Sequence, residues 1–153
     1  LNLGTDQAVG DAFDLIIERA AALGAELDGV YVEAMEPPGD EILVSALRDS
    51  TFGVIVSCGA GGVLTEVIGD VILERGPFDV AVAARMLNQL RVVEQILQRE
   101  PERDMTPLAQ FVSRFSQFAA SVPWSKFVLE VNPVNWTPER VAALDGLLII
   151  EEL

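Results

Sequence analysis

Two short segments near the end of the chain carry oxygen-bearing side chains at a spacing that suits a divalent cation. Glu130 and Asn132 are two residues apart, so a strand here would point both side chains to one face. Asp145 follows 13 residues after Asn132 and would lie beside it if the two segments pair. Mg²⁺ prefers such oxygen ligands and completes its shell with waters and substrate phosphates. Composition alone favours a second interpretation, in which Asn132-Pro133 and Asp145 are turn residues.

A glycine-rich segment from Gly59 to Gly62 follows an apolar run that predicts a strand. Gly61 and Gly62 lack a Cβ atom, so their backbone amides can approach a phosphate closely. The pattern is neither a P-loop nor a dinucleotide fingerprint, because the Gly-Lys-Ser/Thr ending and the third glycine are missing. A hairpin turn has the same pattern. Cys58 precedes the segment and is interpreted as a small buried residue, because no histidine is present to act as its base.

A third set of candidate residues lies in the first third of the chain. Glu33 and Met35 belong to an apolar run, residues 29–35, that predicts a strand. Arg48 ends the next predicted strand, and its planar guanidinium could donate several hydrogen bonds to a phosphate. The sequence alone favours another role for Arg48, an exposed ion pair with Asp49 or another neighbour.

The sequence predicts both helices and strands to position these residues, and the two kinds of element do not alternate regularly. Apolar spacing and end signals predict helices over residues 5–23 and 78–97 and another from residue 106, whose apolar face runs from Leu108 to Phe118. Strands are predicted over residues 29–35, 41–47, 54–57, 71–73, 126–131 and 141–150. Residues 63–68 are ambiguous. Short connections indicate antiparallel neighbours, so the fold class is α+β, a mostly antiparallel sheet with packed helices.

Composition excludes several classes of function. The net charge is −14, with 10 basic residues against 24 acidic ones, which argues against nucleic acid as a partner. No apolar run reaches the roughly 18 residues of a membrane helix. A single cysteine and no histidine exclude an internal disulfide and a Ser-His or Cys-His dyad, and they fit a reducing cytoplasm.

The chain is more apolar than an isolated solvated domain needs to be. Half of its residues are hydrophobic, and it begins with leucine rather than methionine. We therefore expect a single domain, residues 1–153, cut from a longer polypeptide. Its excess apolar surface is expected to be buried in a dense core or against a neighbouring domain.

The three sets of residues together resemble one family, the NDP-forming acyl-CoA synthetases, which include the succinyl-CoA synthetase β subunit and the ADP-forming acetyl-CoA synthetases. Residues 130–134, Glu-Val-Asn-Pro-Val, and residues 144–146, Leu-Asp-Gly, are similar to that family's metal-binding segments. Residues 56–67, with Asp70 following, resemble its glycine-rich stretch, and residues 48–53 resemble its Arg-Asp-Pro-x-Phe-Gly.

The resemblance implies the C-terminal part of an ATP-grasp domain that binds ATP and magnesium. Asn132 and Asp145 would hold the ion, with Glu130 on the same face. Gly61, Gly62 and Arg48 would contact phosphates, and the strand with Glu33 and Met35 would be the hinge that binds adenine and ribose. The reaction would make acyl-CoA from an acid, CoA and ATP. It would also need the remaining ATP-grasp lobe and a CoA-binding domain, so this fragment alone is expected to be inactive.

Two departures from the family pattern keep other functions open. Glu74 stands where the family often has arginine, and residues 92–98 lack the glycine of its Leu-Leu-Glu-Gly segment. A degenerate ATP-grasp module with an assembly or regulatory role is one alternative. Another ATP-dependent carboxylate ligase with the same fold is a second.

Overall fold

The computed structural model describes residues 2–62 and 69–151. The predicted alternatives for residues 63–68 therefore lie outside the described residues. The chain divides into two compact units, residues 1–37 and 38–153. No helix among the described residues is both long enough and apolar enough to cross a membrane.

The first unit contains one helix, α1 (Asp6–Ala22), as predicted. Its start is fixed by Thr5, whose hydroxyl accepts a hydrogen bond from the Ala8 amide at 3.2 Å, and Gly24 beyond its end has a positive φ of 66°. The strand predicted over residues 29–35 is wrong, because this segment joins no sheet in the described part of the chain. An apolar, β-favouring pattern forms a strand only where a partner accepts its backbone hydrogen bonds.

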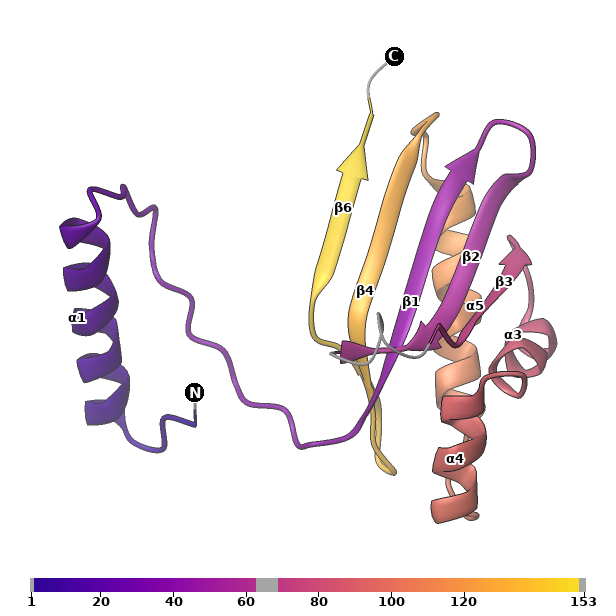
Figure 1. Cartoon of the computed structure of the whole chain (residues 1–153), viewed down its shortest axis with the longest axis horizontal. Helices are drawn as coiled ribbons and strands as arrows, with labels where there is room; N and C mark the ends of the chain where they lie inside the picture. Colours follow the sequence, from indigo (N-terminus) through magenta and orange to yellow (C-terminus); the bar gives the residue numbers. More distant parts are fainter. Residues whose placement is uncertain (1, 63–68, 152–153) are drawn as a thin grey trace. The chain divides into compact units, whose positions relative to one another are not determined.

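The second unit is an antiparallel sheet with helices packed on it, which confirms the predicted fold class (Figure 1). The strand order is β3-β2-β1-β4-β5, and β6 also pairs with β4. The strands are β1 (Asp40–Asp49), β2 (Gly53–Ala60), β3 (Val71–Arg75), β4 (Phe127–Trp136), β5 (Val141–Ala143) and β6 (Gly146–Ile150). The helices are α3 (Val80–Leu87), α4 (Arg91–Arg99) and α5 (Thr106–Ser121).

The core lies between the sheet and the three helices. Alternate residues of β1, namely Ile42, Val44 and Ala46, are buried, as the period of two in a strand requires. They belong to one cluster with apolar residues of β2, β4, α3, α4 and α5. β1 lies between β2 and β4, so it is the strand around which this core forms.

The helix predicted over residues 78–97 is two helices, α3 and α4. The break follows from Asp70, a residue far away in the sequence that is only 6% exposed. Its carboxylate accepts a hydrogen bond from the Val92 amide at 2.8 Å, which satisfies a donor at the start of α4. The residue before α4, Leu90, is fully buried between the two helices and the rest of the core.

The last two predicted strands have different bounds from those expected. β4 continues through Asn132-Pro133 to Trp136, so this dipeptide lies inside a strand rather than at its end. The strand predicted over residues 141–150 is interrupted at Leu144-Asp145 into β5 and β6, which both pair with β4.

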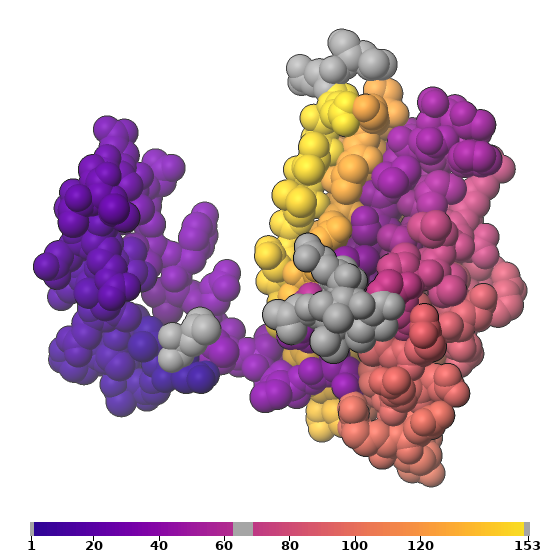
Figure 2. All heavy atoms as spheres, in the orientation of Figure 1, coloured from indigo at the N-terminus to yellow at the C-terminus, as the bar shows by residue number. Residues whose placement is uncertain are grey.

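Apolar side chains remain exposed at one edge of the sheet. β6 is an edge strand, and its four leucine and isoleucine residues are 42–52% exposed. Figure 2 shows this strand along the outer edge of the second unit. Exposed edge strands usually carry charged residues or are covered by another segment, which prevents pairing with other chains. The exposure agrees with the expectation that the chain has more apolar surface than its own core buries.

The buried thiol of Cys58 makes a pH-dependent prediction. Burial raises the pKa of this thiol from 9.0 to about 12. The folded chain therefore keeps the thiol proton at pH values where the unfolded chain loses it. We expect the free energy of unfolding to be unaffected by this group below about pH 8.5 and to fall as the pH rises further, by at most about 1.4 kcal/mol per pH unit.

Urea unfolding between pH 7 and pH 11 measures this dependence. The matched control is Cys58→Ala, which removes the thiol and leaves every other ionisable group in place. The alkaline slope should be smaller in the variant, and equal slopes would contradict the prediction.

Candidate functional site

The two predicted metal-binding segments are adjacent in the sheet. The backbone N–H of Asn132 donates a hydrogen bond to the backbone carbonyl of Asp145 at 3.2 Å. The backbone N–H of Leu144 likewise donates to the backbone carbonyl of Pro133 at 3.0 Å. The interruption between β5 and β6 therefore lies beside the Asn132-Pro133 dipeptide of β4. The Asp145 carboxylate is exposed and accepts from the Gly146 amide at 2.8 Å, as a turn residue does.

The glycine-rich segment reaches the same place from the other side of β1. The Gly62 amide donates to the side-chain Oδ1 of Asn132 at 2.9 Å, although the two residues are 70 positions apart. The Gly61 amide donates to the Glu41 carbonyl at 2.8 Å. Two motifs that the sequence presents separately are therefore brought into direct contact.

Both glycines lie where no other residue fits without movement. A Cβ atom on Gly61 would lie 2.8 Å from the backbone of Glu41 and Ile42, closer than real Cβ atoms come to other groups. Gly62 has a positive φ of 61°, and a Cβ atom there would overlap the Glu41 carboxylate. The close approach to the β1 backbone therefore requires glycine at position 61, and the positive φ favours glycine at position 62.

Sequence reasoning missed Glu41. It is the second residue of β1, next to Asp40 and before the apolar run Ile42-Leu43-Val44, so the sequence marks it only as an exposed polar residue at the start of a strand. Its carboxylate lies against Gly62 and its carbonyl binds Gly61. Nothing in the local sequence signals either contact, because both depend on the return of the chain after β2.

The predicted metal ligands offer only oxygen atoms. Glu130 pairs with Leu147 of β6, two residues before Asn132 along β4. No cluster of three or more His, Cys, Asp or Glu side chains suited to a metal occurs in the described ranges. An amide oxygen and one or two carboxylates fit Mg²⁺ that arrives already bound to phosphates, since such an ion needs few protein ligands.

Arg48 lies at the other end of β1. Leu43 is the β1 residue that lies level with Asn132-Pro133. Arg48 is five positions further along β1, roughly 17 Å away at the usual rise of a strand. The Arg48 guanidinium donates to the carbonyls of Val122 at 3.0 Å and Ala120 at 3.4 Å, at the end of α5. It also lies over the Phe127 ring, with its carbon 5.6 Å from the ring centre.

The remaining two candidate residues belong to the first unit. Glu33 and Met35 lie in the segment that follows α1 and that joins no sheet in the described structure. Both side chains are exposed, and Met35 is 59% exposed. The structure describes this unit by itself, so Glu33 and Met35 stay predictions.

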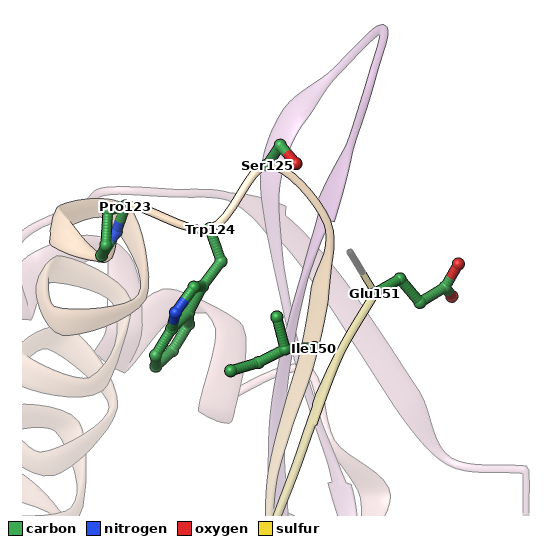
Figure 3. Close-up of a pocket in the computed structure, with 5 residues that line it drawn as sticks. All are labelled: Pro123, Trp124, Ser125, Ile150 and Glu151. Carbon is green, nitrogen blue, oxygen red and sulfur yellow. The ribbon is translucent and has the colours of Figure 1, made fainter. Parts of the chain in front are cut away.

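A separate pocket of about 630 Å³ lies at the far end of β6. It is lined by Pro123, Trp124, Ser125, Ile150 and Glu151. Trp124 and Ile150 face each other across it, whereas Glu151 points away (Figure 3). Ile150 pairs with Phe127, five residues before Asn132 on β4, so this pocket is distinct from the candidate metal site.

Comparison with known proteins shows which family this chain is similar to. Residues 1–150 match a family model described as an ATP-grasp domain. The chain is 36% identical to "Trans-feruloyl-CoA synthase FCS1" from an unknown prokaryotic organism, over 99% of this chain and 22% of that protein. It is 26% identical to the β subunit of the ADP-forming acetate–CoA ligase I of Pyrococcus furiosus, over 98% of this chain and 66% of that subunit.

A solved structure has the same fold. It is the dinucleotide-forming acetyl-coenzyme A synthetase 1 of Ca. Korarchaeum cryptofilum in complex with coenzyme A and Mg-AMPPCP, which superposes with a TM-score of 0.84 at 25% identity. The alignment covers 99% of this chain and 67% of that chain. The chain thus spans about a fifth of the feruloyl-CoA synthase and two thirds of the shorter relatives. It belongs to the ATP-grasp domain family.

Proposed function

We propose that this chain is the nucleotide- and magnesium-binding part of an NDP-forming acid–CoA ligase that makes acyl-CoA from an acid, CoA and ATP in the cytoplasm. The observation that carries the proposal is the contact between the two motifs, in which Gly62 binds the Asn132 side chain and Asn132 binds the Asp145 backbone. The named relatives, which are acid–CoA ligases, support the choice of reaction.

In this proposal Asn132 and Asp145 hold the magnesium ion of the nucleotide, with Glu130 beside them. The ion supplies positive charge that stabilises a phosphoryl group during transfer. Asn132 contributes a neutral oxygen and Asp145 a charged one, so the pair orients the ion and leaves most of its charge for the phosphates. Gly61 and Gly62 form the edge of the phosphate site.

The remaining parts of the reaction belong to other segments of the parent protein. The Korarchaeum structure was solved with a phosphohistidine segment pointing towards its nucleotide-binding site, and this chain contains no histidine. We therefore assign the phosphorylated histidine, the CoA-binding domain and the other ATP-grasp lobe to the parent protein. Glu33 and Met35 would supply the adenine and ribose contacts where the two lobes meet.

A second candidate function is a degenerate module kept for assembly or regulation. One observation favours it, since the amides of Gly61 and Gly62 already bind acceptors of the protein itself. A module of this kind would keep the fold and lose the nucleotide. Binding of Mg-AMPPCP to the chain distinguishes the two candidates.

The first test is calorimetric titration of the chain with Mg-AMPPCP. We expect a dissociation constant in the ordinary range for enzyme substrates, below about 1 mM. Asp145→Asn should weaken binding at least tenfold and leave the thermal unfolding midpoint unchanged, because Asp145 is exposed. Asp14→Asn, the same substitution on the exposed surface of α1, is the control. Binding that is absent, or equally strong in Asp145→Asn, would contradict the proposed site.

The chain by itself should not complete the reaction. With ATP, CoA and short-chain acids we expect no acyl-CoA, because the groups that take part in the later steps lie outside it. Acyl-CoA can be followed by chromatography. Turnover at about 1 s⁻¹ or faster, an ordinary enzyme rate, would show that the chain needs no other domain.

Arg48 allows a test that separates stability from binding. Arg48→Ala should lower the free energy of unfolding by about 1–3 kcal/mol, because the carbonyls of Ala120 and Val122 lose a charged donor. Arg114→Ala, on the exposed side of α5, is the control. The same two variants are titrated with Mg-AMPPCP. An affinity that does not fall in Arg48→Ala would contradict the expectation from the sequence that Arg48 contacts a phosphate.

A further inference from the structure

We infer that Asn132 is a positioning residue for the glycine-rich segment, in addition to its proposed place beside the magnesium ion. Its side chain holds Gly62 where the chain leaves β2. It therefore fixes the position of the backbone that, in the proposed function, lies beside the phosphates. This inference deepens the proposed function, on which its relevance to nucleotide binding rests.

Three successive amides at the end of β2 are held by three different parts of the fold. The Ala60 amide donates to the Asp70 carbonyl at 3.3 Å, and the Gly61 amide donates to the Glu41 carbonyl at 2.8 Å. The Gly62 amide donates to Asn132 Oδ1 at 2.9 Å. The first two acceptors are backbone groups, whereas the third is a side chain. Position 132 is therefore where a single substitution removes one of these three acceptors.

The chemistry of an amide side chain allows Asn132 to have both roles. Its carbonyl oxygen carries two lone pairs, so a hydrogen bond from Gly62 leaves one pair for another donor or for a cation. The side chain is partly buried in β4, and the strand fixes its backbone. A contact that fixes the loop can therefore coexist with metal binding through the same oxygen.

The Glu41 side chain also lies against Gly62. Its carboxylate occupies the space next to the Gly62 Cα atom, where a Cβ would lie. Gly62 also has a positive φ, which glycine adopts without steric cost. The Glu41 side chain is exposed and can move away, so the directed restraint on the Gly62 amide is its hydrogen bond to Asn132. We therefore expect that loss of the Asn132 oxygen weakens the protection of the Gly62 amide, which the contact with Glu41 does not restore.

The bond can be detected directly in the unaltered chain by NMR. A through-hydrogen-bond coupling should connect the Gly62 amide nitrogen with the Asn132 side-chain carbonyl carbon. This measurement needs no variant, so it does not depend on whether a substituted chain folds. Absence of the coupling, with a fast-exchanging Gly62 amide, would overturn the inference.

Amide hydrogen exchange at Gly62 tests the role of the side chain. Asn132→Ala should speed exchange at Gly62 at least tenfold, whereas Asn132→Asp keeps an acceptor oxygen and should restore slow exchange. Asn88→Ala, the same substitution at an exposed residue after α3, is the control and should change nothing at Gly62. Equal exchange rates in the Asn132→Ala variant and the unaltered chain would overturn the inference.

Titration with Mg-AMPPCP then separates this inference from the proposed function. In the unaltered chain and in Asn132→Asp, the Gly62 amide resonance should shift as nucleotide binds, and in Asn132→Ala the shift should be lost. A chain that shows the coupling and the exchange pattern but binds no Mg-AMPPCP would overturn the proposed function and support the positioning role. A chain that binds Mg-AMPPCP but shows no coupling between Gly62 and Asn132 would support the proposed function and overturn the positioning role.

Discussion

The pairing of Ile42 with two neighbours at once is the constraint on which the candidate site depends. In the antiparallel register, Ile42 lies opposite Ala60 of β2 and opposite Val134 of β4. The chain that leaves β2 after Ala60 and the Asn132-Pro133 dipeptide of β4 must therefore lie near the same end of β1. If β2 or β4 slipped by one residue against β1, the side chains of that strand would turn to the opposite face of the sheet. The glycine-rich segment and Asn132 would then no longer meet.

The same register places Arg48 beside another part of the fold. It lies where β1 turns into β2, close to the end of α5 rather than to Asn132. The carbonyl groups at a helix C-terminus carry partial negative charge, and a guanidinium is a favourable partner for them. Its contacts hold α5 against the sheet. That packing buries Phe115 and Ala119 of the helix in the core.

Local patterns in the sequence were sufficient for most elements but not for contacts between distant segments. The strands after residue 40, their antiparallel pairing and α5 follow from apolar periodicity and turn signals. The division between α3 and α4 depends on Asp70, and the role of Glu41 depends on the return of the glycine segment. Residues 29–35 have a strand pattern whose partner is absent from the described residues, so the pattern alone was misleading. The roles in binding predicted for Glu33, Met35, Arg48, Gly61, Gly62, Glu130, Asn132 and Asp145 stay predictions.

If the proposed nucleotide site is correct, its charge determines which form of the nucleotide binds there. The Glu41 carboxylate lies against Gly62, Asp145 is bonded to Asn132 through its backbone, and Glu130 is two residues before Asn132 on β4; none of the three forms an ion pair among the described residues. A bare polyphosphate would be repelled by this group, and the net charge of −14 adds to the repulsion. A magnesium complex carries much less negative charge and offers a cation to the oxygen ligands. Binding at this site should therefore require the metal complex rather than the free nucleotide.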